Sequence, residues 1–492
     1  MRIYLLRSFV FLFQLLYGLS LAGQEIDIKG LDSLIMSWDE PDSPGGYLAI
    51  FKGEETIYSR GFGYADIETQ QQFTTGTLFP ISSMTKHMTA ICVLKLVEEG
   101  RLKLDDELVE YFPELESYAH GVLIKDLLNH TSGIASWPSA ATMRGYRIYK
   151  FEKSPLGWLV DHGHLEYEPG HYFRYSNTSF RLAGELVSRV SGQSLPDFAE
   201  AELFSKLGMS NTFYRPDPNK PIANMASGYV YNHDGEFEKR NSQVTHLGPV
   251  GVYTTVDDFQ KWDQAMQNET ILTAEHHKLL QTSYALRNGA ETSYAYGQVL
   301  GEYEGIREES HGGLDYDWGY ESFYARFPEY NLTYVFFKNN PELDRKASLL
   351  AISSMIFKKE IASRPSSQNN EKTEHRESIY PESLINSPSK YKRSKKLAAF
   401  VGTYYSETID ATYFLSLDDN NSLMLNAGNL DEMELSWIDK TTAKAPLYHI
   451  NSLQLSGRTP VLKFRVENKE ATGFLLDSGG ANNIEFSRIV PD

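Results

Sequence analysis

The segment FPISSMTKHM, residues 79–88, places Ser83 three residues before Lys86 at the start of a helical run. The run MTAICVLKLVEEG, residues 88–100, has apolar residues at helical spacing and ends on a glycine. Residues three apart share a helix face, so the lysine amine can reach the serine hydroxyl. A serine needs a base before it becomes a nucleophile, and a lysine whose pKa is lowered by burial can be that base.

A single Ser-x-x-Lys match is weak, because a helix cap followed by a surface lysine has the same pattern. Two later segments strengthen it. Tyr175-Ser176-Asn177 stands just before a second helix, FRLAGELVSRVSG. Tyr175 could relay a proton, and Asn177 could bind a substrate amide or hold Lys86. His311-Gly312-Gly313 leads toward a late strand, where glycines would let a backbone amide approach an oxyanion.

In this order, the three motifs resemble those of the serine β-lactamase and penicillin-recognising enzyme superfamily. The resemblance is closest to its class C branch, with the related esterases, DD-peptidases and D-aminopeptidases. It extends over residues 30–357 and includes further blocks: TLFPISSMTKHMTAICVLKLVEEGRLKLDDELVEYFPE, IKDLLNHTSGI, PGHYFRYSN and GPVGVYTTVDDFQKW. Together these blocks are far more specific than any one motif.

The resemblance implies three catalytic roles. Ser83 would be the acylated nucleophile and Lys86 its activating partner. Tyr175 would transfer the proton to the leaving group and later handle the water. Ser82, the neighbouring serine, would be a bystander.

The resemblance also implies a substrate-binding set with one departure. Asn177 would orient the substrate, and the backbone amides of Ser83 and Leu314 would form the oxyanion hole. The β-lactamases carry Lys-Thr-Gly where this chain has His311, Gly312 and Gly313. Position 312 lacks the hydroxyl, and a histidine is mostly neutral near pH 7. We therefore expect poor recognition of a substrate carboxylate, which favours ester or peptide substrates over antibiotics.

The chain is expected to have four parts. Residues 1–22 have a positive start, an apolar run and small residues before a cut after Ala22, as in a secretory signal peptide. Residues 23–357 would be the hydrolase body, and the polar segment 358–396 a linker. Residues 397–492 alternate polar and apolar positions in roughly eight short strands, which predicts an antiparallel barrel or sandwich.

The body is expected to be a mixed α/β domain with one sheet flanked by helices. GGYLAIFKGEETIYSRGFGYAD, residues 45–66, is typical of two strands joined at Lys52-Gly53. LTYVFFKN, residues 332–339, is typical of a late buried strand, and helical segments lie between the two regions.

The composition limits which partners and cofactors are expected for this chain. The net charge of −18 repels phosphate backbones, so nucleic acid is not expected as a partner. No segment after the signal is long and apolar enough to span a membrane. The single cysteine, Cys92, lies among apolar residues and is expected in the core. Neither a Gly-x-Ser-x-Gly elbow nor histidines at zinc spacing are present, so no metal or cofactor is predicted.

These features predict a periplasmic or secreted serine hydrolase that cleaves an ester or amide through an acyl-enzyme. Its β-lactamase activity is expected to be weak. Two alternatives stay open: a D-aminopeptidase or DD-peptidase that acts on peptidoglycan-type peptides, and a relative that binds such ligands without catalysis. The oligomeric state does not follow from the sequence.

Overall fold

A computed structural model of the chain describes residues 26–143, 154–232, 234–315, 317–363, 397–407, 411–418, 421–426, 433–437, 441–444, 461–477 and 484–489. The predicted signal peptide and nearly all of the predicted linker lie outside these residues. Helix α12 (Arg345–Ser363) runs past residue 357, so the start of the segment predicted as linker is helical. That the C-terminal part is a separate domain stays a prediction.

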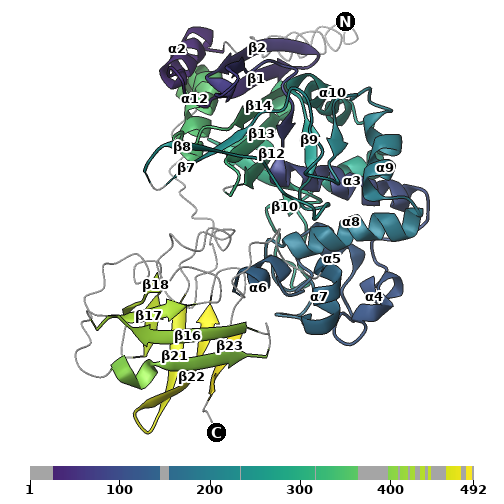
Figure 1. Cartoon of the computed structure of the whole chain (residues 1–492). Helices are drawn as coiled ribbons and strands as arrows, with labels where there is room; N and C mark the ends of the chain where they lie inside the picture. Colours follow the sequence, from purple (N-terminus) through teal and green to yellow (C-terminus); the bar gives the residue numbers. More distant parts are fainter. Residues whose placement is uncertain are drawn as a thin grey trace, which may run out of the picture.

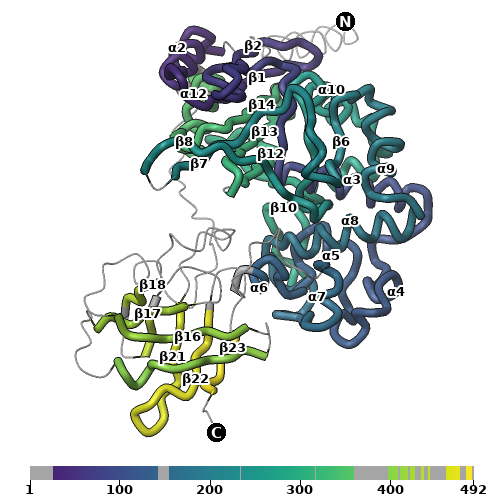
Figure 2. The backbone as a smooth tube through the Cα atoms, in the orientation of Figure 1, coloured from purple at the N-terminus to yellow at the C-terminus, as the bar shows by residue number. Residues whose placement is uncertain are grey.

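The body is built on a seven-stranded antiparallel sheet in the order β10-β11-β12-β13-β14-β1-β2. Its strands are β1 (Gly46–Lys52), β2 (Glu55–Phe62), β10 (Tyr294–Ala295), β11 (Gln298–Tyr303), β12 (Ile306–Asp315), β13 (Tyr320–Phe327) and β14 (Leu332–Lys338). β1 pairs with β14, from Gly46 opposite Lys338 to Lys52 opposite Leu332. Figure 2 shows this return of the chain, with the purple first strands beside green β14. The predicted hairpin and the predicted late buried strand are confirmed, since every residue of β14 is buried.

Helices cover both faces of this sheet, as expected from the mixed composition (Figure 1). Alternate residues of β1 enter different cores: Leu48 and Ile50 join the cluster with α2 (Ile28–Trp38) and α12, whereas Ala49 and Phe51 join the larger cluster with α3 (Thr85–Glu98). This alternation follows from the two-residue period of a strand. The larger cluster lies on the side of the sheet where the helical region packs.

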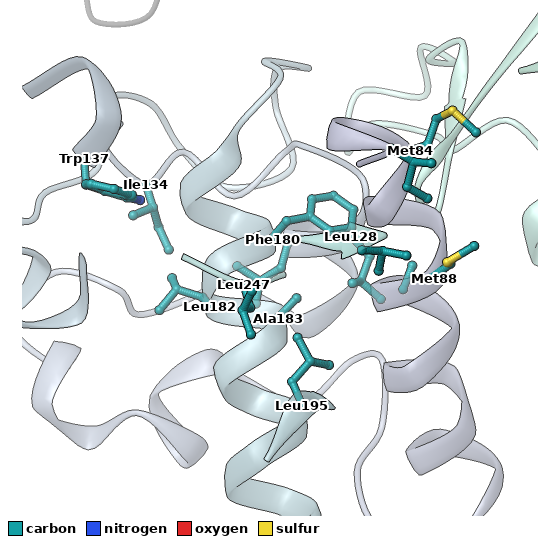
Figure 3. Close-up of a cluster of buried hydrophobic side chains, with 14 of the residues drawn as sticks. Met84, Met88, Leu128, Ile134, Trp137, Phe180, Leu182, Ala183, Leu195 and Leu247 are labelled. Atoms are coloured by element: carbon teal, nitrogen blue, oxygen red, sulfur yellow. The ribbon is translucent and has the colours of Figure 1, made fainter. Parts of the chain in front are cut away.

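The helical region centres on α3 and α8 (Asn177–Ser191). Figure 3 shows Phe180 and Ala183 of α8 near the start of α3, with Met84 in the turn just before α3 and Met88 in its first turn. Both helices were predicted, and Gly192 ends α8 in the left-handed conformation that glycine favours, with φ of 76°. The other helices are α4 (Leu108–Tyr111), α5 (Ile124–Leu128), α6 (Trp137–Met143), α7 (Pro155–His162), α9 (Leu195–Ala199), α10 (Val256–Gln267) and α11 (Ala274–Leu280).

Short strands link the sheet to the helical region. β5 (Phe79–Pro80), β9 (Val252–Thr254) and β6 (Phe213–Tyr214) form one small sheet, and β7 (Gly228–Tyr231) and β8 (Phe237–Arg240) form a hairpin. A further pair joins β3 (Tyr64–Asp66) to β4 (Gln71–Gln72). Cys92 is buried in the core, as predicted. In the part of the chain that the structure describes, no helix combines the length and hydropathy of a membrane span.

The C-terminal strands form one antiparallel sheet in the order β18-β17-β16-β15-β23-β22-β21-β20-β19. Its strands are β15 (Gly402–Ser406), β16 (Ala411–Leu417), β17 (Leu423–Asn426), β18 (Met433–Glu434), β19 (Ser436–Trp437), β20 (Thr442–Lys444), β21 (Val461–Glu467), β22 (Glu470–Asp477) and β23 (Ile484–Ile489). The two edge strands, β18 and β19, are separated in the chain only by Leu435, so they are halves of one strand. The sheet therefore curls round to meet itself, which favours the predicted barrel over the sandwich.

A buried ion pair fastens α10 to the sheet close to the third motif. Arg326 of β13 donates two hydrogen bonds to Asp263 of α10, at 2.7 and 3.0 Å, and lies 3.7 Å from Glu309 of β12. Both partners are almost fully buried, so each charge depends on the other for compensation.

Asp263→Ala is expected to lower the free energy of unfolding by about 3–5 kcal/mol, because it leaves the Arg326 charge buried without its main partner. Urea unfolding measures this change. The matched control is Glu275→Ala, which removes an exposed carboxylate and should change stability by no more than about 0.5 kcal/mol. Equal effects of the two substitutions would contradict the assigned role of the ion pair.

Candidate active site

Ser83 lies in a tight turn, η1 (Ser82–Met84), directly before α3. The turn is held from two sides: the Ile81 amide donates to the Val252 carbonyl at 3.0 Å, and Ser322 of β13 donates to the Ile81 carbonyl at 2.8 Å. Ser82 has φ of 47°, a left-handed conformation that is strained for a serine. Ser82 is buried, whereas Ser83 is partly exposed. Of the two serines, Ser83 is the one that a substrate can reach.

Lys86 is fully buried beside Ser83. Its Nζ lies 3.0 Å from Ser83 Oγ, donates to the Pro249 carbonyl at 2.9 Å, and stands 4.8 Å from the centre of the Tyr175 ring. Among the described residues no carboxylate forms an ion pair with it. Burial lowers the pKa of Lys86 well below its ordinary value of 10.5. The uncharged amine can accept the proton of the Ser83 hydroxyl.

Tyr175 approaches Ser83 from the segment before α8, and the Ser83 side chain lies close enough to influence its phenol. Burial raises the pKa of Tyr175 well above its ordinary value, so the phenol keeps its proton at neutral pH. A protonated phenol at this place can donate to an atom bonded to the reacting carbon. Ser83, Lys86 and Tyr175, which the sequence predicted to act together, are thus brought together in one site.

Asn177 is the first residue of α8, and its side-chain oxygen is buried without a hydrogen-bond partner in the described part of the chain. The suggested bond between Asn177 and Lys86 is not made. An unpaired buried carbonyl oxygen is poised to accept a hydrogen bond from a ligand. The unpaired oxygen therefore supports the other role suggested for Asn177, which is to bind a substrate amide.

His130 belongs to the site but was not assigned a role from the sequence. Its Nδ1 accepts a hydrogen bond from the Ser176 amide at 3.0 Å, and its ring centre lies 4.3 Å from that of Tyr175. It holds the segment that carries Tyr175 and Asn177. The only sequence signal was its place in the block IKDLLNHTSGI, and a lone histidine in such a block does not show which backbone amide it accepts from.

The third motif lies on the part of β12 nearest the nucleophile turn. β11 pairs with β12 only as far as Ser310, so the strand has no partner on that side from His311 onward. A Cβ on Gly313 would lie 2.2 Å from the Ile81 carbonyl oxygen and 3.0 Å from Ser82 Cβ. Only glycine allows this approach. Leu314 follows on the same edge, and its oxyanion-hole role stays a prediction.

His311 is held uncharged. Its Nδ1 lies 2.7 Å from the Gly312 carbonyl oxygen and its Nε2 lies 3.2 Å from the Tyr294 hydroxyl. The carbonyl can only accept, so we assign the proton to Nδ1, and the Tyr294 hydroxyl then donates to Nε2. Burial lowers the pKa of His311 to about 3. His311 therefore offers no positive charge to a carboxylate.

A cation that the motifs did not reveal lies on the opposite side of this strand. A Cβ on Gly312 would come within 2.4 Å of Arg345 Nη1, at the start of α12. The Arg345 side chain is 40% exposed and lies 3.9 Å from Glu321, so its charge is screened. The contact joins residues far apart in the chain, which is why no local pattern indicated it. Within the described ranges, no group of three or more His, Cys, Asp or Glu is placed to hold a metal ion.

Comparison with known proteins agrees with this geometry. The family model described as Beta-lactamase matches residues 35–352, which include all three motifs. The chain belongs to the beta-lactamase family. It is a serine hydrolase of this family, and the resemblance drawn from its motifs is confirmed.

Two relatives and one solved structure show how similar the chain is to known proteins. The chain is 28% identical over 331 residues to penicillin-binding protein 4* of Bacillus subtilis (strain 168), covering 64% of this chain and 72% of the relative. It is 26% identical over 280 residues to a D-aminopeptidase of Brucella anthropi, covering 56% and 52%. The octameric penicillin-binding protein homologue from Pyrococcus abyssi superposes with a TM-score of 0.60 at 21% identity, covering 94% of this chain and 100% of that one. At that identity the structural likeness concerns the fold alone.

Lys86→Met is expected to raise the free energy of unfolding at pH 7. Because the pKa of Lys86 is lowered on folding, the unfolded chain binds one more proton between that pKa and 10.5, and this destabilises the folded state. At pH 7 the gain should be about 1.4 kcal/mol for each unit by which the pKa falls below 10.5, counted only down to pH 7, less the lost hydrogen bond. It should shrink as the pH approaches 10.5.

Urea unfolding at a series of pH values measures this difference. Lys103→Met, which replaces an exposed lysine, is the matched control and should show little dependence on pH. A stability difference for Lys86→Met that stays constant from pH 7 to above 10.5 would mean that Lys86 is charged in the folded enzyme.

Proposed function

We propose that this enzyme cleaves an ester or amide through an acyl-enzyme on Ser83. The observation that carries the proposal is the 3.0 Å contact between Ser83 Oγ and a buried Lys86 amine that has no carboxylate partner among the described residues. Lys86 takes the hydroxyl proton as Ser83 Oγ attacks the carbonyl carbon. The charge that develops on the carbonyl oxygen is stabilised by the amides of Ser83 and Leu314 at the edge of β12.

Collapse of the tetrahedral intermediate requires a proton on the departing amine or alcohol. Tyr175 supplies it, because its phenol is protonated and lies beside Ser83 and Lys86. The proton that Lys86 took then replaces the one that Tyr175 lost. Water then enters, loses a proton to Lys86 and Tyr175, and attacks the acyl carbon. Ser83 regains its proton from the same pair, and the acid product leaves.

Export to the periplasm or the medium is part of the proposal and rests on the signal-like pattern of residues 1–22. The substrate class rests on the relatives. The name of one relative, D-aminopeptidase, supports the alternative that this chain releases residues from D-peptides. A relative without catalysis is the other alternative, and it would show no covalent modification of Ser83.

Ser83→Ala is expected to lower kcat for 4-nitrophenyl acetate hydrolysis by at least about 10³-fold while the protein stays folded, because only one hydroxyl is lost. Ser82→Ala is the matched control and should keep most of the activity, since the Ser82 hydroxyl is buried. Steady-state rates and circular dichroism of the two variants test this. An inactive Ser82 variant beside an active Ser83 variant would reverse the assignment.

Turnover of benzylpenicillin is expected to be slow compared with that of activated esters. Gly312 offers no hydroxyl to a substrate carboxylate, His311 is uncharged, and the Arg345 charge is screened by solvent. The measurement is kcat/KM for benzylpenicillin beside that for 4-nitrophenyl acetate. Benzylpenicillin turnover as efficient as ester turnover would show that carboxylate recognition has another source.

A further inference from the structure

One carboxylate near the nucleophile has no role in the mechanism above. Asp315 is the last residue of β12, two positions beyond Gly313. Alternate residues of a strand point to the same face, so Asp315 shares the face on which Gly313 meets Ser82 Cβ. Two residues of strand span about 7 Å, which places Asp315 within reach of a ligand bound at Ser83.

Asp315 has little compensation for its charge. Ser242 lies near its carboxyl and favours the ionised form, and no cationic side chain among the described residues forms an ion pair with it. Burial and the nearby Asp317 charge raise the pKa of Asp315 well above its ordinary value. Part of the surface of Asp315 is exposed to solvent, so a ligand can reach it.

The two arginines of this region are engaged elsewhere. Arg215 donates to the Tyr253 hydroxyl at 3.1 Å and to the carbonyls of Pro218 and Lys220 at 2.6 and 3.0 Å. Arg240 donates to Glu238 at 3.1 and 3.2 Å and to the Asp317 carbonyl at 3.4 Å. Neither arginine therefore compensates an ionised Asp315, and a ligand that brings a positive charge to this place would favour the ionised carboxylate.

The strand direction shows which part of the substrate would meet Asp315. Along β12, His311 lies on the Tyr175 side, with their ring centres 6.2 Å apart, and Asp315 lies on the other side of Gly313. Tyr175 serves the leaving group, so the leaving group occupies the His311 end. The acyl group then extends toward Asp315.

We propose that Asp315, supported by Ser242, binds a cationic amine carried by the acyl part of the substrate. This inference rests on the proposed acyl-transfer function for the orientation of the substrate. It narrows the substrate class to aminoacyl esters or amides with a free amine. N-acylated substrates, which lack the charge, would bind without this contact.

Calorimetric titration of Ser83→Ala protein tests the subsite without turnover. The probes are D-alaninamide and L-alaninamide, each beside its N-acetyl counterpart. At least one free-amine probe is expected to bind at least about tenfold more tightly than its acetylated form, as for a charge-assisted hydrogen bond. Adding Asp315→Asn should remove that preference, and adding Ser242→Ala should reduce it.

The matched control is Asp234→Asn, which replaces an exposed carboxylate in the β7–β8 turn and should leave the preference unchanged. If Asp315→Asn does not fold, as judged by circular dichroism, the Ser242→Ala result decides. Equal affinity of the free and acetylated probes, or a preference that survives both substitutions, would overturn the proposal. Failure of the proposed function is a separate result, because it appears as ester hydrolysis or labelling that does not depend on Ser83 in the wild-type enzyme.

Discussion

The site depends on one constraint: an amine buried next to a serine with no carboxylate partner among the described residues. Lys86 can remain there only if it gives up its charge, because burying an ammonium ion without compensation is far more costly than losing a proton. The same burial that destabilises the charged form turns the lysine into a base at neutral pH. Its contacts to Ser83 and to the Pro249 carbonyl fix where the lone pair and the protons point.

The rest of the body holds this arrangement in place. α3 is buried along most of its length, so Lys86 cannot turn toward water. The nucleophile turn is held between β9 and β13, and β12 presses its glycine edge against the turn. His130 fixes the segment that brings Tyr175 to Ser83. Each contact joins residues from different parts of the chain, so the site exists only when the sheet and the helical region are assembled.

Much of the fold and of the candidate site could be predicted from the sequence. The pair Ser83 and Lys86 could be predicted because a helix places residues three apart on one face. Hairpins and the buried strand β14 follow from local periodicity. Arg345 and His130 could not be predicted, since each acts through contacts with distant segments. The C-terminal sheet curls because its two edge strands, β18 and β19, are joined through Leu435. The pattern of polar and apolar residues predicts strands but does not predict which strands lie at the edges. The end of α12 was also missed, because the polar run Lys358-Lys359-Glu360 was interpreted as the start of the linker, whereas the helix continues to Ser363.

The most direct test is a carbon-13 NMR titration of enzyme labelled at the lysine Cε positions. The Lys86 signal is assigned as the one that is absent from Lys86→Met. An uncharged Lys86 at pH 7 predicts a Cε shift typical of a neutral amine, with a titration midpoint well below the ordinary 10.5. A Lys86 signal that stays at the ammonium position up to pH 10 would contradict the account, because a charged lysine cannot take the proton of Ser83.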